Sequence, residues 1–193
     1  ASDITRTFPA NGRFTAAQRD LYDLVLASQA AAVQATRAGA RFTDPHDATV
    51  RVLSQGLLDL GLLQTKVHGT VDDVIAQRHY FRFYMHRTGH WLGMDVHDCG
   101  SYVEPGETGS GTTRPDPLSG ETITDRPSRI LRPGMVTTIE PGLYVRAADD
   151  VPQAFWNLGI RIEDDAVITP DGCELLTRDV PVEAEAIEAL MRG

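Results

Sequence analysis

His86-Arg-Thr-Gly-His-Trp-Leu-Gly-Met-Asp-Val-His97 holds three of the six histidines in the chain. It also separates two kinds of sequence, since helical patterns precede it and short β-branched runs with frequent Gly and Pro follow it. This order predicts a mixed fold of helices and a sheet. Histidine titrates near neutral pH and is the commonest metal ligand, so the cluster suits proton transfer or metal coordination, unless its members are only polar residues of a loop.

Two glutamates follow this cluster on predicted strands. Glu140 stands in Val136-Thr-Thr-Ile-Glu-Pro-Gly142, where the proline favours an extended backbone and the glycine permits a sharp exit. Glu163 stands in Gly159-Ile-Arg-Ile-Glu-Asp-Asp165, and a period of two puts it on one face with Arg161. These two residues form either a simple ion pair or a metal ligand with the partner that orients it.

A third carboxylate lies near the start of the chain. Residues 3–8 alternate, which predicts a strand with Asp3, Thr5 and Thr7 on one face. Several carboxylates and one imidazole make an oxygen-rich donor set, which favours Mn²⁺ or a related divalent ion over a sulfur-bound structural zinc. Two such ions about 3.5–4 Å apart lower the pKa of a shared water and polarise a carbonyl, as peptide hydrolysis requires.

Local signals predict the other elements. Thr15 and Gln18 form a capping box that opens a helix reaching about Ala38. A second helix begins at Asp44 and Pro45 and runs to Gly61, a short one begins at Thr70, and a last one covers 182–192. Strands are predicted at 135–140, 159–163 and 166–169, and a long polar loop bordering the site at 103–128.

The composition limits the classes of function. The net charge is −9, and the basic residues are scattered, so a nucleic-acid partner is not expected. We find no apolar run long enough to span a membrane and no export signal at the start, and we expect a cytoplasmic protein. Cys99 and Cys173 are the only cysteines and are predicted to be buried, reduced thiols.

The ordered motifs resemble those of the aminopeptidase P and prolidase family. They are His86-x-x-x-His90-Trp-Leu-Gly-x-Asp-Val-His97-Asp98, then Arg132-Pro-Gly-Met-Val-x-Thr-x-Glu140-Pro-Gly-Leu-Tyr144, then Gly159-Ile-Arg-Ile-Glu163-Asp-Asp. The opening Asp3-Ile-Thr-Arg-Thr-Phe-Pro9 is similar to the family's metal-binding strand. The resemblance implies a pita-bread α/β (α+β) fold, with a curved, mainly antiparallel sheet flanked by helices. It also implies cleavage of the bond between an N-terminal residue and a following proline in peptides.

The resemblance assigns roles by position. It implies two divalent metal ions, Mn²⁺ first and Co²⁺ or Zn²⁺ as alternatives, and the residues that resemble their ligands are Asp3, His90, Glu140 and Glu163. His86 and His97 resemble the histidines that bind substrate and stabilise the tetrahedral intermediate, and Glu140 resembles a proton shuttle. Arg161 resembles the arginine that supports the ligands, and Tyr144 lies where a tyrosine borders the substrate site.

One family ligand has no counterpart in the chain. The family carries another aspartate upstream of the position of Asp3, together with a further histidine, the first part of the sheet and an amino-terminal domain. We therefore expect residues 1–193 to form a partial catalytic domain that is inactive or poorly active alone. Its expected partners are the missing part of the same enzyme and, when intact, further copies of it.

Three alternatives stay open. The fold occurs in non-catalytic peptide-binding modules and in metal-free hydrolases of the creatinase kind, but both lack the ligands that His90, Glu140 and Glu163 resemble here. Prolidase, which takes Xaa-Pro dipeptides, shares nearly all of these motifs. The stretches His90-Trp-Leu-Gly and Gly-Leu-Tyr144 favour the aminopeptidase.

Overall fold

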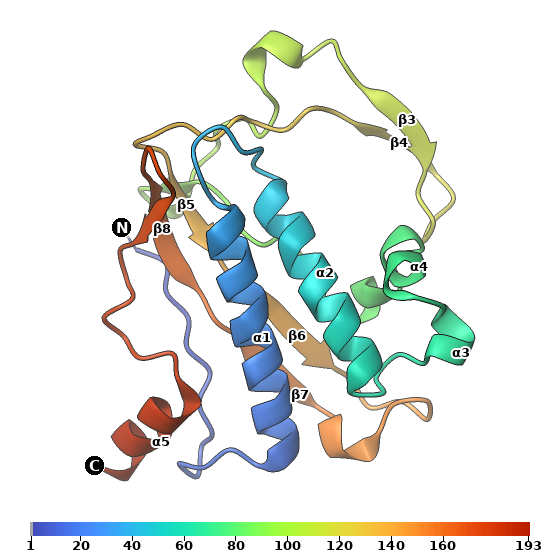
Figure 1. The fold of residues 1–193 in the computed structure, drawn as a ribbon, viewed down its shortest axis with the longest axis vertical. Coiled ribbons are helices and arrows are strands. Elements are labelled where there is room, and N and C mark those ends of the chain that lie inside the picture. Colours follow the sequence, from blue (N-terminus) through green and yellow to red (C-terminus); the bar gives the residue numbers. More distant parts are fainter. Residues whose placement is uncertain (1) are drawn as a thin grey trace.

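Two long helices form one layer of the fold (Figure 1). In the computed structural model, which describes residues 2–193, these are α1 (Ala16–Ala35) and α2 (Asp44–Asp59). The predicted capping box opens α1, because Thr15 and Gln18 bond to each other's backbone N–H groups. α1 ends at Ala35, earlier than predicted, because the backbone of Thr36 turns extended while its hydroxyl donates to a carbonyl of the last turn.

The remaining helices are short. They are α3 (Thr65–His68), α4 (Val71–Ala76), α5 (Ala184–Arg192) and the 3-10 turns η1 (His79–Arg82), η2 (Pro105–Glu107) and η3 (Gln153–Phe155). α4 begins at the predicted Thr70 cap, and α5 confirms the predicted last helix. No helix within residues 2–193 combines the length and the apolar character that a membrane crossing needs.

The strands are short, and all their pairings are antiparallel. They are β1 (Leu92–Gly93), β2 (Val96–His97), β3 (Thr112–Pro115), β4 (Thr122–Asp125), β5 (Val136–Ile139), β6 (Gly142–Val145), β7 (Leu158–Arg161), β8 (Asp164–Ile168) and β9 (Cys173–Leu175). The pairs are β1 with β2, β3 with β4, β6 with β7, and β8 with both β5 and β9. The mixed fold with antiparallel strands confirms the predicted class.

A break in one long ribbon places the two glutamates of the candidate site. β5 and β6 run in line on one side, β7 and β8 run in line on the other, and Ile139 pairs with Asp164 just before the break. Gly142 pairs with Arg161 just after it, so the register carries through unchanged. Glu140 and Glu163 therefore stand opposite each other at the break, beside Pro141 on one strand.

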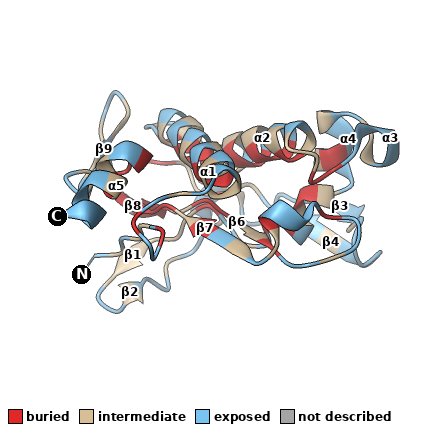
Figure 2. Ribbon diagram, turned by 90° about the horizontal axis from the view of Figure 1, so that it is seen from below, coloured by how far each residue is buried: buried red, intermediate tan, exposed pale blue. Residues whose placement is uncertain are grey.

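The hydrophobic core lies between the helical layer and the strands (Figure 2). Its fully buried side chains come from the inner faces of α1, α2 and the ribbon, and include Leu21, Val25, Leu53, Leu57, Leu143 and Ile162. Burial of such side chains from water is the main force that holds the two layers together. The opposite face of the ribbon is left for polar residues.

Three predictions need correction. Residues 3–8 are extended, but they form only one backbone bridge, between Thr5 and Glu163, because Asp3 and Thr7 on either side bond to Asp165 and Arg161 through side chains. The stretch 103–128 is not one loop, since it contains the hairpin of β3 and β4, whose tip is joined to the end of α4 by an ion pair of Arg78 and Asp116. Cys99 is exposed rather than buried, because it lies in a surface turn after β2.

Candidate metal centre and active site

Glu163 is the most buried acidic residue of the candidate site. Only 2% of its surface is exposed, and the Thr5 hydroxyl donates a short hydrogen bond to its carboxylate. Burial, opposed by that hydrogen bond and reinforced by the nearby charges of Glu140 and Asp3, raises the pKa of Glu163 to about 7. Negative charges therefore converge here with little solvent to screen them, and a cation is the natural complement.

His90 turns its Nε2 toward these carboxylates. Its Nδ1 lies 3.0 Å from the carbonyl oxygen of Trp91, and because a carbonyl can only accept, Nδ1–H is the donor. In the neutral ring Nε2 then has no proton, yet it lies 3.2 Å from Asp3 Oδ2 and 3.6 Å from Glu140 Oε1. Acceptors that face each other at such distances need a positive charge between them, and metal-ligating histidines commonly donate their other N–H to a backbone carbonyl.

The segment that carries His90 runs along the outer edge of β5. Glu140 N–H donates to the Thr88 carbonyl at 2.7 Å, and Thr138 N–H donates to the His90 carbonyl at 3.0 Å. Gly89 is required for this approach, because a Cβ at that position would lie 2.1 Å from the Thr138 carbonyl oxygen. The close contact between 88–91 and β5 thus brings His90 beside Glu140.

Asp3 reaches the site on the extended amino-terminal segment. Its backbone N–H donates to the Asp165 carboxylate at 3.1 Å. Arg6 clamps the same segment, since its guanidinium pairs with the fully buried Asp164 at 2.8 Å and donates to the Glu163 carbonyl at 2.7 Å. Asp164 and Arg6 escaped the sequence analysis, although the alternation of residues 3–8 correctly placed Thr5 on the same side as Asp3.

Two groups of possible metal ligands result, and they share one residue. In each group the donor atoms lie within 4.8 Å of one another: one group is Asp3, His90 and His97, and the other is His90, Glu140 and Glu163. All four residues predicted as ligands are therefore brought together. The exposed His97 packs its ring edge-on against that of His90 at 4.2 Å, so it borders the same centre.

The other predicted residues form a chain of polar contacts beside this centre. Arg161 lies 3.6 Å from Glu140 and donates through Nε to the Tyr144 hydroxyl at 2.8 Å. That hydroxyl lies 2.9 Å from His86 Nε2, and His86 Nδ1 lies 2.7 Å from the Arg87 carbonyl. Both hydrogen bonds of His86 are satisfied when the Tyr144 hydroxyl donates to His86 Nε2 and His86 Nδ1–H donates to the Arg87 carbonyl. Burial lowers the pKa of His86 and so favours this neutral ring.

Asp3, His90, Glu140 and Glu163 thus form a donor set of the kind that holds divalent metal ions. The chain belongs to metallopeptidase family M24, which matches residues 1–170. An Xaa-Pro aminopeptidase of Escherichia coli is 46% identical over 191 residues, covering 99% of this chain and 38% of that protein. A human Xaa-Pro dipeptidase is 39% identical over 211 residues, covering 100% of this chain and 40% of that protein.

Solved structures show the same fold. An aminopeptidase of Pseudomonas aeruginosa superimposes with a TM-score of 0.84 at 46% identity, over 99% of this chain and 38% of the other. Proline aminopeptidase P II of Yersinia pestis gives a TM-score of 0.82 at 43% identity, again over 99% and 38%. These similarities confirm the predicted family and fold. They also show that the chain spans well under half the length of these relatives.

Proposed function

We propose that this chain forms the greater part of the metal centre of an Xaa-Pro aminopeptidase. The observation that carries the proposal is the convergence of His90 Nε2 with the carboxylates of Asp3 and Glu140, next to the buried Glu163. The names of the relatives support the reaction class, because the bacterial proteins that match 99% of this chain at 46% and 42% identity are Xaa-Pro aminopeptidases.

The donor set fits two divalent ions. Asp3, His90, Glu140 and Glu163 would hold them, and three carboxylates with one imidazole suit Mn²⁺ better than a thiolate-preferring metal. When bound, such ions polarise the substrate carbonyl and lower the pKa of the attacking water. One E. coli aminopeptidase P structure is described as zinc-substituted, so Zn²⁺ is a useful comparison for that protein and this one.

We assign the proton transfer to Glu140. An amide next to proline is tertiary, so its nitrogen must gain a proton before it leaves. The Glu140 carboxylate borders the metal centre on one oxygen and faces Arg161 at 3.6 Å with the other. We propose that it accepts a proton from water and delivers it to the proline nitrogen, while Arg161 stabilises its charge.

His86, His97 and Tyr144 are proposed to handle the substrate. The exposed His97 beside His90 is free to meet the developing oxyanion. Both nitrogens of His86 are already hydrogen-bonded, to Tyr144 and to the Arg87 carbonyl. A substrate group that bonds to His86 therefore has to replace the Tyr144 hydroxyl, which couples these two residues in binding.

The chain spans 38% of its E. coli relative, so we propose that it works within a longer polypeptide, here called the full-length protein. The residues before Asp3 in that protein would complete the metal site. The cytoplasmic location and the homo-oligomeric assembly expected from the sequence stay predictions. Dipeptidase activity is the second candidate, because the human Xaa-Pro dipeptidase matches the whole chain.

The test uses the full-length protein after removal of metal. Calorimetric titration with Mn²⁺ should show two ions per chain, and chromatography should show release of the first residue from an Xaa-Pro-Xaa peptide in preference to cleavage of an Xaa-Pro dipeptide. Glu140→Gln should lower kcat by about a thousandfold, whereas Glu174→Gln, at an exposed position on β9, should have no effect. A protein that takes up no metal, or a fully active Glu140→Gln, would refute the proposal.

A further inference from the structure

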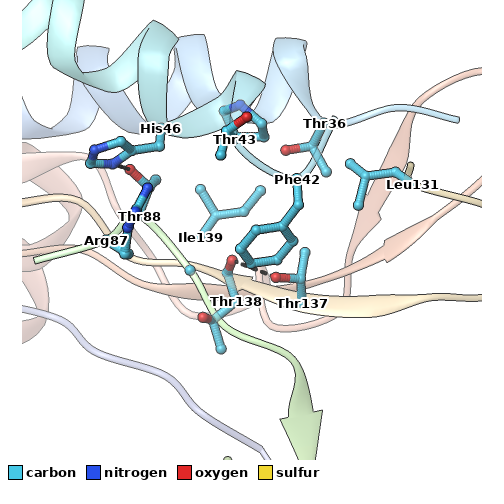
Figure 3. A pocket seen from close by; sticks show the side chains of 12 residues that line it. Thr36, Phe42, Thr43, His46, Arg87, Thr88, Leu131, Thr137, Thr138 and Ile139 are labelled. Carbon is cyan, nitrogen blue, oxygen red and sulfur yellow. Dashed lines mark hydrogen bonds between the residues drawn. The ribbon is translucent and has the colours of Figure 1, made fainter. Parts of the chain in front are cut away.

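Behind the candidate active site lies a second polar network. His46, on α2, has its Nδ1 3.0 Å from the Thr88 hydroxyl (Figure 3). The same hydroxyl lies 2.6 Å from the hydroxyl of Tyr84. Thr88 is 3% exposed and Tyr84 is fully buried, so neither hydroxyl is free to bond to solvent. The function proposed above does not use these three side chains.

The protons of this network can be placed by elimination. Among the described residues, the Tyr84 hydroxyl has Thr88 as its single hydrogen-bond partner, so it must donate there or leave a buried proton unpaired. The Thr88 hydroxyl then gives its own proton to His46 Nδ1. His46 is therefore neutral and carries its proton on Nε2. The direction runs from Tyr84 through Thr88 to His46.

Thr88 connects this network to the active-site residues. Its carbonyl accepts the 2.7 Å hydrogen bond from the Glu140 N–H. The Thr88 side chain therefore bonds to His46 on α2, while its backbone bonds to Glu140 at the end of β5. The Tyr84 ring packs edge-on against the His86 ring at 4.9 Å. The segment 86–90 thus contacts α2 at its middle residue, Thr88, and supplies His90 at its end.

Packing alone does not hold the segment on this side. A cavity of about 20 Å³ lies beside Thr88, between the start of α2 and β5. Its lining includes Phe42, Thr43, Leu131, Thr137 and Ile139 (Figure 3). The volume suffices for about one water molecule. The hydrogen bond between Thr88 and His46 therefore joins the segment to α2 beside a gap in the packing.

We propose that His46, Thr88 and Tyr84 are positioning residues that hold the segment 86–90 against α2 and so align His86 and Glu140 for peptide hydrolysis. This inference rests on the proposed function. A hydrogen-bonded network of buried side chains fixes one orientation, where apolar side chains beside a cavity permit several. None of the three residues touches the substrate in this role.

The test compares variants of the full-length, Mn²⁺-loaded protein. Thr88→Val removes the hydroxyl and keeps the shape, and it should lower kcat ten- to a hundredfold with KM within about twofold and an unchanged metal content. Thr88→Ser should restore most of the rate. Thr49→Val is the matched control, because Thr49 is a fully buried threonine of α2 whose hydroxyl has no hydrogen-bond partner within residues 2–193. It should leave kcat unchanged.

Tyr84→Phe supplies an independent measurement if Thr88→Val does not fold. It should also lower kcat, and the double variant should be no slower than Thr88→Val alone, because both changes break one network. A wild-type kcat in Thr88→Val or Tyr84→Phe, a loss confined to KM, or additive losses in the double variant would overturn the inference.

A separate readout does not need activity. If the wild-type protein cleaves no Xaa-Pro peptide, the proposed function fails, and the network is then judged by NMR of protein labelled with ¹⁵N in histidine. The His46 signals, identified by their loss in His46→Asn, should show a neutral ring with its proton on Nε2, and Thr88→Val should shift them while Thr49→Val does not. A proton found on Nδ1 would overturn the inference.

Discussion

Replacement of Gly89 by alanine should separate the segment 88–91 from β5. The added Cβ would lie 2.1 Å from the Thr138 carbonyl oxygen, where real Cβ atoms keep at least 3.0 Å. The obstacle is backbone, so no rotamer change relieves it. The segment has to move outward by about 1 Å, which is enough to exceed hydrogen-bonding distance at a close backbone contact.

The size of the effect follows from the hydrogen bonds that such a shift would break. Four join the segment to β5 and the residue after it: Glu140 N–H to the Thr88 carbonyl at 2.7 Å, Thr138 N–H to the His90 carbonyl at 3.0 Å, the Thr137 hydroxyl to the same carbonyl at 2.9 Å, and His90 N–H to the Thr138 hydroxyl at 3.0 Å. At about 1 kcal/mol each, Gly89→Ala should lower the free energy of unfolding by about 4 kcal/mol. That is a substantial share of the stability of an ordinary domain.

Urea denaturation of the metal-free, full-length protein followed by circular dichroism measures this loss. Gly109→Ala is the control, because nothing lies within 4 Å of a Cβ there and the backbone is not left-handed. Mn²⁺ titration of the folded variant should also show weaker binding, since His90 and Glu140 move apart. An unchanged denaturation midpoint together with unchanged Mn²⁺ affinity would refute the role given to Gly89.

Three further predictions concern stability. Burial, aided by nearby positive groups, lowers the pKa of His46 to about 4, so His46 takes up a proton at higher pH in the unfolded chain than in the folded one. The free energy of unfolding should therefore fall by about 3 kcal/mol as pH drops from about 6.5 to 4. The urea midpoint of His46→Asn should fall less over the same range. Thr15→Ala should cost about 1 kcal/mol in the same assay by removing the cap of α1. Asp164→Ala should lower the free energy of unfolding by about 3–5 kcal/mol, because it leaves the largely buried guanidinium of Arg6 without this ion pair. Asp125→Ala, which breaks an exposed ion pair, should lower it by under about 1 kcal/mol. Equal losses in the two variants would contradict the role given to Arg6.

Signals that act within a few residues predicted their elements well. The capping box of Thr15 and Gln18 fixes the start of α1, and Thr70 does the same for α4. The sequence Glu140-Pro-Gly predicted a strand end that aims a carboxylate, and the break between β5 and β6 confirms it. The convergence of the predicted ligands was expected from family resemblance, since no local pattern sets the distance between residues so far apart in sequence.

Features that depend on distant partners escaped the sequence. Residues 3–8 alternate as a strand does, but only Thr5 makes a backbone bridge, whereas Asp3 and Thr7 take part in hydrogen bonds that involve side chains. The hairpin at 112–125 was hidden among Gly, Pro and Thr, which are common in loops. The sequence did not predict a role for His46, a single histidine on a helix, because that role depends on a hydrogen bond to Thr88, which lies 42 positions further along the chain.

The bridge between Thr5 and Glu163 has a consequence for biosynthesis. The bonded side chains lie 158 positions apart, and Arg6 also donates to the carbonyls of Val180 and Pro181. A growing polypeptide on the ribosome therefore exposes Asp3 long before Glu163 has been translated, and contacts of such long range form slowly. The four candidate ligands are therefore present together only after Glu163 has been translated, so these residues cannot hold metal before that point.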